Sequence, residues 1–257
     1  MFEIFLLPIF LVAILLILAI PIIFIYLFLR LSETAFEQVG FDHWHASLAV
    51  FGSVVGSLFD LPLHSGPISS YPGWYVSLVS AVGLNFATAF HPFYLAVNLG
   101  GCLIPLAVSL DLLRRGRTSV SKAVLGIAIV TGITYYFATP IANEGIVLPF
   151  WLSPALAAVC GLVLGKGYDK APALAYISGS MGTLLGADIF NLITPGVLPA
   201  LSPLGTHITR PLVMSIGGAG VFDGIFLTGV LAVLFAAGIV CIFHRSCKGV
   251  RMHRSGL

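Results

Sequence analysis

Two aspartates interrupt apolar, glycine-rich segments of this chain. Asp188 ends the stretch Leu-Leu-Gly-Ala-Asp, and Asp223 follows Ser215-Ile-Gly-Gly-Ala-Gly-Val-Phe. A charged side chain is costly in hydrocarbon, so an acid inside an apolar segment is a functional candidate by default. Two carboxylates held close together can share a proton or activate a water molecule. We therefore predict that Asp188 and Asp223 lie close together and form the core of the functional site.

The predicted substrate-binding residues lie with the two aspartates in the outer half of the bundle. They are Asn98, Glu144, Asn191, Gly218 and Gly220. Asn98, Glu144 and Asn191 are predicted to supply donors and acceptors around the two aspartates. Gly218 and Gly220 are predicted to hold the chain in a non-helical conformation before Asp223, because glycine is a poor helix former. The histidines and cysteines show no metal-ligand spacing, and no cofactor is predicted. The four cysteines are expected to be small core residues rather than a disulfide framework.

The composition is that of a membrane protein. The chain of 257 residues is 58% hydrophobic and only 9% charged, whereas soluble domains carry about 25% charged residues. The lipid bilayer is therefore the expected partner. The net charge of +2 is too small to indicate a nucleic-acid partner. The substrate stays open among a small cation, a small molecule and a peptide.

The hydrophobic pattern predicts an all-α fold, a polytopic transmembrane bundle of about seven spans in a single integral membrane domain, 1–257. A span needs about 20 apolar residues. The segment Tyr75–Phe90 is polar and follows a turn-rich stretch, so we expect it to form an outer-face loop or hairpin cap rather than an eighth span. The predicted spans are residues 2–29, 44–61, 92–113, 120–139, 149–165, 172–193 and 222–243.

The basic residues predict the orientation. With the N-terminus outside, eleven of the twelve Lys and Arg residues lie in cytoplasmic segments, and only Arg210 is external. Cytoplasmic loops carry an excess of Lys and Arg. We therefore predict a multi-pass protein of the cell (plasma) membrane, with an external N-terminus and a cytoplasmic C-terminus.

These motifs together resemble a family of uncharacterised prokaryotic integral membrane proteins. The resemblance covers about Gly56 to Ala237, and its most specific parts are the two aspartate segments. At the second span the family pattern tends to show Asn-Ile-Pro, where this chain has Asp60-Leu61-Pro62. The family has no established function, so the resemblance implies membership and the location of the site. The segments that carry it are Asn98-Leu-Gly-Gly, Ile104-Pro105, Glu144-Gly-Ile, Ala175-Tyr-Ile-Ser-Gly, Leu184-Leu-Gly-Ala-Asp188 and Ser215-Ile-Gly-Gly-Ala-Gly-Val-Phe-Asp223-Gly-Ile-Phe-Leu-Thr-Gly.

Two functions fit an intramembrane acidic site. The first is cation- or proton-coupled transport or binding, because acids beside glycine-interrupted backbone are how such sites are built. The alternative is an intramembrane aspartyl protease, in which Asp188 and Asp223 act as an acid–base pair. Gly218-Ala-Gly220 before Asp223 is similar to the Gly-x-Gly-Asp signature of presenilin-like enzymes, although neither aspartate sits in an intact copy of it.

Overall fold

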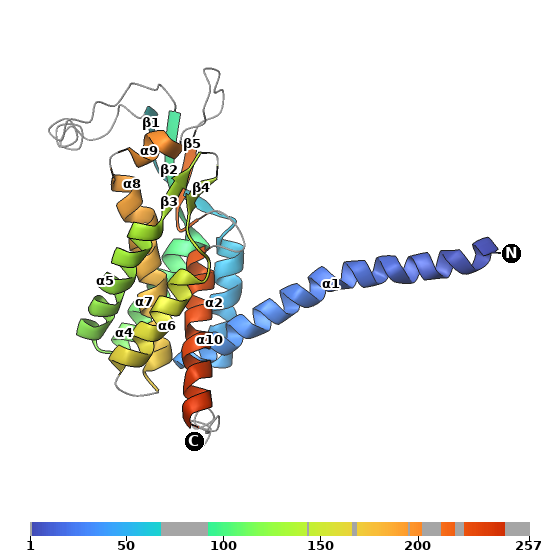
Figure 1. Ribbon diagram of the computed structural model, residues 1–257, viewed down its shortest axis with the longest axis horizontal. Coiled ribbons are helices and arrows are strands. Elements are labelled where there is room, and N and C mark those ends of the chain that lie inside the picture. The colour runs from blue at the N-terminus through green and yellow to red at the C-terminus, as the bar shows by residue number, and fades with distance from the viewer. Residues whose placement is uncertain are drawn as a thin grey trace.

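The computed structural model describes residues 2–67, 92–142, 144–165, 169–194, 196–201, 212–218 and 224–244. It is a helical bundle that carries a small sheet at one end (Figure 1). The bundle helices are α2 (His43–Gly56), α4 (Ile104–Arg114), α5 (Val120–Phe137), α6 (Leu152–Gly165), α7 (Ala171–Thr183) and α10 (Gly224–His244). The predicted all-α bundle is thus confirmed.

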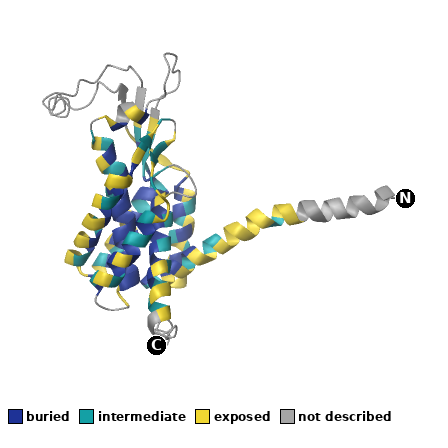
Figure 2. Cartoon of the chain, viewed as in Figure 1, coloured by how far each residue is buried: buried dark blue, intermediate teal, exposed yellow. Residues whose placement is uncertain are grey.

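Helix α7 is the core of the bundle. All thirteen of its residues are buried, and it packs against α5, α6 and α10. Figure 2 shows the buried residues concentrated along the middle of the bundle and exposed residues on its outside. Glycines let the neighbouring helices approach closely. Gly179 faces Ala157 of α6 and Ala232 of α10, whereas Gly182 faces Val130 of α5.

The outer surface of the bundle is apolar. Among the described residues, four helical segments are long and apolar enough to cross a membrane: Leu16–Val39, Val120–Phe137, Ala171–Ile193 and Gly224–Ile242. The exposed side chains of α5 and α10 include Val124, Ile129 and Phe235. In water this surface would be unfavourable, but hydrocarbon solvates it well. The chain is therefore a helical membrane protein.

The long first helix, α1 (Phe2–Val39), leaves the bundle at the end opposite the sheet (Figure 1). It continues ten residues beyond Leu29, the predicted end of the first span, so Arg30 lies inside a helix rather than after it. The helix continues because its last residues, after Arg30, form an amphipathic segment that packs on the bundle. Ser32, Ala35, Phe36 and Val39 are buried, and their spacing places them on one helical face.

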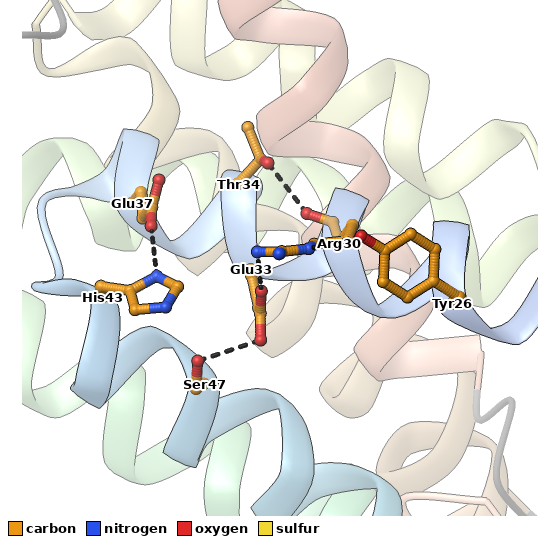
Figure 3. A network of polar contacts seen from close by, with 7 residues as sticks. All are labelled: Tyr26, Arg30, Glu33, Thr34, Glu37, His43 and Ser47. Atoms are coloured by element: carbon orange, nitrogen blue, oxygen red, sulfur yellow. Dashed lines mark hydrogen bonds and ion pairs between the residues drawn. The ribbon is translucent and has the colours of Figure 1, made fainter.

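Polar contacts fasten this part of α1 to α2 (Figure 3). Ser47 Oγ donates to Glu33 Oε1 at 2.9 Å, and His43 Nδ1 lies 2.9 Å from Glu37 Oε1. Arg30 Nη1 lies 3.4 Å from the other Glu33 oxygen. Individually such exposed contacts contribute at most about 1 kcal/mol. Together they fix the angle between the two helices.

Described basic residues gather at this same end of the bundle. Arg117 Nη2 donates to the Gly40 carbonyl at 3.2 Å, and Arg115 lies over the ring of Phe41, 5.3 Å from its centroid. Lys122 Nζ donates to the Gly165 carbonyl at 3.3 Å. The α1–α2 connection, the α4–α5 connection and the end of α6 therefore lie here, and we call this the basic end. The opposite end is the sheet end.

The sheet has three strands in the order β1–β2–β5: β1 (Asp60–Pro67), β2 (Pro92–Asn98) and β5 (Leu212–Ile216). β1 pairs antiparallel with β2, from Asp60 opposite Asn98 to Pro67 opposite Pro92. β5 pairs parallel with β2, from Phe93 opposite Leu212 to Val97 opposite Ile216. The segment Tyr75–Phe90 lies outside the described residues. The strands before and after it are β1 and β2, and the last residue of β1, Pro67, lies opposite the first residue of β2, Pro92.

Two predicted spans differ from the structure here. The segment 44–61 is helical only in α2, His43–Gly56, and its last residues, Asp60 and Leu61, belong to β1. The segment 92–113 begins with β2 and continues through the π-helical η2 (Leu99–Leu103) into α4. Aromatic and β-branched residues in Phe93–Val97 favour a strand. A short apolar run does not distinguish strand from helix by periodicity.

The remaining elements also lie toward the sheet end (Figure 1). β3 (Thr139–Ile141) and β4 (Gly145–Val147) form an antiparallel hairpin after α5. After α7 the chain continues through the π-helical η3 (Leu184–Phe190), α8 (Asn191–Ile193) and α9 (Val197–Leu201). Cys102 and Cys160 are buried, as expected of core residues. Cys241, in contrast, is disulfide-bonded, which the sequence did not predict.

Substitution of Gly100 tests the contact between α2 and η2. A Cβ on Gly100 would collide with the Ser53 carbonyl oxygen and the Ser57 amide nitrogen, both backbone atoms that cannot rotate away. We expect Gly100→Ala to destabilise the protein by about 1–3 kcal/mol, as overpacking does. Thermal unfolding of the purified protein in detergent measures this. Gly132→Ala in α5 is the matched control, because a Cβ there meets no atom within 4 Å. Equal melting temperatures for the two variants would contradict the contact.

Candidate functional site

Asp188 lies where the central helix changes its winding. α7 gives way at Leu184 to η3, in which backbone hydrogen bonds run from residue i to i+5. Such π-helical segments occur frequently at functional sites. The wider turn carries Asp188 to β5, where its Oδ2 accepts a 2.7 Å hydrogen bond from the Gly217 amide.

Side chains from α5 and from α8, which follows η3 directly, support this change of winding. Thr131 Oγ1 donates to the Gly182 carbonyl at 3.2 Å, and Asn191 Nδ2 donates to the Gly186 carbonyl at 2.9 Å. A Cβ on Gly186 would collide with the Thr134 hydroxyl, so only glycine allows α5 to approach so closely. Asn191, a predicted site residue, lies three residues after Asp188, and its side chain binds the backbone of η3 at Gly186.

A second π-helical segment reaches the same strand end. Gly217 has a φ of 98°, a conformation that glycine adopts readily. A Cβ on it would lie 2.7 Å from the Cys102 amide nitrogen in η2. Gly217 thus contacts η2 through its Cα and Asp188 of η3 through its amide. The end of β5 is the point where both irregular helical segments meet.

Asn98 holds η2 and β1 together. It is fully buried. Its Oδ1 accepts from the Gly101 amide at 2.8 Å, and its Nδ2 donates to the Ser57 carbonyl at 2.9 Å and to Asp60 Oδ1 at 3.0 Å. A buried amide with all of these partners positions its neighbours firmly. Asn98 therefore orients the carboxylate of Asp60.

Asp60 brings a second carboxylate to the end of β5. The hydroxyl of Ser215 donates to the same Asp60 Oδ1 that Asn98 contacts. Ser215 and Gly217 are two residues apart, which is about 7 Å of extended chain. The carboxylates of Asp60 and Asp188 are therefore bound to neighbouring positions on one strand end, and we call these two acids with Asn98, Ser215 and Gly217 the strand-end site.

No described cation neutralises this site. The ion pairs of the described residues join Arg30 to Glu33, His43 to Glu37 and Arg115 to Asp111. None of them includes Asp60 or Asp188. The described residues also contain no group of three or more His, Cys, Asp and Glu side chains that could hold a metal ion. No described Lys or Arg side chain thus pairs with either carboxyl group of the strand-end site.

The other predicted site residues are placed as follows. Glu144 is exposed in the β3–β4 turn, where its amide donates to the Ile141 carbonyl. Gly218 has a φ of 75° and its amide donates to the Ser215 carbonyl at 3.2 Å. This agrees with the expectation of non-helical backbone there. Gly220 and Asp223 lie outside the described residues, so the pairing of Asp188 with Asp223 stays a prediction.

The predicted site residues did not include Ser215, Gly217, Thr131 or Thr134. Asp60 was noted only as the position where this chain departs from the family pattern. The threonines carried a signal, since they are two hydroxyl residues three apart inside an apolar span. Ser215 and Gly217 stood within a quoted motif. Their contacts depend on the register of β5 on β2, which sequence spacing does not predict.

Exchanging the two partners of the Asn98–Asp60 hydrogen bond tests the site. Asn98→Asp places a carboxylate beside that of Asp60, so we expect a loss of stability of about 1–3 kcal/mol. Asp60→Asn in the same chain restores a donor–acceptor pair and should recover part of that loss, a coupling that a double-mutant cycle measures. Thermal unfolding of the single and double variants provides the values. Strictly additive losses would show that the two side chains do not interact.

Comparison with known proteins gives a family but no function. No curated protein and no solved structure matches the chain. One family model does match, over residues 54–235, which is more than half of the chain. The matched region contains the whole strand-end site. The chain belongs to the family described as "Protein of unknown function (DUF1614)".

Proposed function

We propose that this protein is an ion-coupled membrane carrier whose ion, a proton or a small monovalent cation, binds at Asp188. The observation that carries the proposal is the pair of carboxylates, Asp60 and Asp188, bound to one strand end with no described Lys or Arg beside them. Like charges held close together favour uptake of a proton or cation. Acids inside the membrane commonly mark ion pathways.

The backbone around Asp188 supports the same proposal. Carriers often place their ion sites where a helix is interrupted near the middle of the chain's passage through the membrane. Here η3 interrupts the long helical segment Ala171–Ile193 at Leu184. Asp188 Oδ2 is held by the Gly217 amide, and no described donor binds Oδ1. One carboxylate oxygen is therefore fixed while the other is left for an ion.

The alternative, an intramembrane aspartyl protease, depends on Asp223 as the second catalytic carboxylate. Asp223 lies outside the described residues, and no described contact favours hydrolysis. Ion coupling needs only Asp188 and its described surroundings. It is therefore the function that we put forward.

Asp188→Asn tests this function directly. The purified protein is placed in liposomes that contain a pH-sensitive dye, and a sodium or potassium gradient is imposed. We expect cation-driven proton movement in the unsubstituted protein, and a fall of about tenfold or more in Asp188→Asn, because the amide carries no charge to hold the ion. Asp111→Asn is the control, since Asp111 pairs with Arg115 at 2.7 Å near the basic end. Unchanged flux in Asp188→Asn, or no flux in any sample, would refute the proposal.

We further propose that the basic end is cytoplasmic, in accordance with the excess of Lys and Arg there. Arg114 at the basic end and Glu144 in the β3–β4 turn are both exposed, so a cysteine at either position can react. A membrane-impermeant maleimide should label Glu144→Cys in intact cells. It should label Arg114→Cys only after the membrane is permeabilised. The reverse pattern would invert the topology.

A further inference from the structure

Helix α7 carries a row of hydroxyl groups that leads toward Asp188. Tyr176, Ser180 and Thr183 follow each other at spacings of four and three residues, which places them on one face of the helix. The π-helical hydrogen bonding of η3 runs over five residues, so Asp188 lies one π turn beyond Thr183. The row extends over twelve residues, or about 18 Å of helix.

The hydroxyls in this row are buried, and among the described residues only one of them makes a hydrogen bond. Tyr176 is 1% exposed and Thr183 is 5% exposed, and neither hydroxyl has a hydrogen-bond partner among the described residues. The Ser180 hydroxyl donates to the Tyr176 carbonyl at 2.7 Å, which leaves its lone pairs able to accept. A buried hydroxyl without a partner is unfavourable. Internal water usually supplies the missing hydrogen bonds in such places.

From this row we infer that the ion taken up by Asp188 is a proton, which reaches it from the basic end through ordered water held by Tyr176, Ser180 and Thr183. The inference rests on the proposed function of Asp188. Each water, and the Tyr176 and Thr183 hydroxyls, accept a proton on a lone pair and release their own to the next, so no other bond changes. The Ser180 hydroxyl, whose proton is bound to the Tyr176 carbonyl, holds the water by accepting a hydrogen bond from it. Asp188 becomes a carboxylic acid when the proton arrives and a carboxylate when it leaves toward Asp60.

Aromatic rings pack around Tyr176, at the end of this route nearest the basic end. A tyrosine side chain in a helix leans toward the helix N-terminus, which here is the basic end. The ring of Phe36 in α1 lies 5.4 Å from the ring of Tyr176, and Phe36 in turn stacks on Phe226 of α10 at 6.3 Å. The Tyr176 ring also fits against Gly229, where a Cβ would lie 2.8 Å from its Cε2. Entry of a proton therefore requires a movement of Phe36, whose helix is fastened to α2 by Glu33 and Ser47.

Hydroxyl-deleted variants test the route in the same proteoliposome assay. Tyr176→Phe and Thr183→Val should each lower proton flux about tenfold, because each interrupts the chain of donors and acceptors. Ser178→Ala is the matched control. Its hydroxyl is equally buried and without a described partner, but it lies on another face of α7, against Gly126 of α5. Flux in Ser178→Ala should stay within about twofold of the unsubstituted protein.

The outcomes separate the route from the site. Normal flux in Tyr176→Phe and Thr183→Val together with lost flux in Asp188→Asn overturns the route and leaves the site intact. Normal flux in Asp188→Asn overturns the proposed function itself. A second measurement needs neither flux nor a variant. Radiolytic footprinting in the unsubstituted protein oxidises side chains beside internal water, so Tyr176 should be modified despite its burial. An unmodified Tyr176 would overturn the water route.

Discussion

A helix inside a membrane must satisfy its backbone polar groups within the protein, because hydrocarbon offers no hydrogen-bond partners. At η3 the central helix leaves regular α-helical hydrogen bonding, and the carbonyls of Gly182, in the last turn of α7, and Gly186, in η3, each accept a hydrogen bond from a side chain. Thr131 and Asn191 are the donors. Both contacts lie on the backbone that precedes Asp188, and they stabilise the conformation in which its carboxylate reaches the Gly217 amide at the end of β5.

The sheet positions the partners of Asp188 and Asp60 at the end of β5. β5 reaches the bundle only because it pairs with β2, and β2 is continuous with η2 through Asn98. Gly217, directly after β5, therefore contacts both π-helical segments: it packs against Cys102 of η2 and donates its amide to Asp188 of η3. Glycine is required there by its φ of 98° and by the approach of Cys102. Asp60, from the edge strand β1, also reaches β5, where the Ser215 hydroxyl donates to its carboxylate. Two acids far apart in the sequence thus bind residues two positions apart, Ser215 and Gly217, at the end of one strand.

The sequence predicted those features that follow from composition and periodicity. Apolar segments at Val120, Ala171 and Gly224 gave helices close to their expected bounds, because long apolar runs have few alternatives in a membrane. The predicted span 92–113 begins instead with the strand residues Phe93–Val97, because a five-residue apolar run fits either a strand or a helix. Asp188 stands out in the sequence as a singular acid in an apolar helix, but its Gly217 partner is set by strand register and could not be read from spacing. The predicted partner, Asp223, lies outside the described residues.

The arrangement of the site depends on the hydrogen bond between Asp188 and the Gly217 amide, and hydrogen exchange of that amide measures it. Strand pairing of β5 ends at Ile216, so among the described residues the Asp188 carboxylate is the acceptor that protects this amide. The account predicts slow exchange of the Gly217 amide in the unsubstituted protein and exchange faster by at least about tenfold in Asp188→Ala, the loss expected from one charge-assisted hydrogen bond. Equal exchange rates in the two proteins would contradict the account.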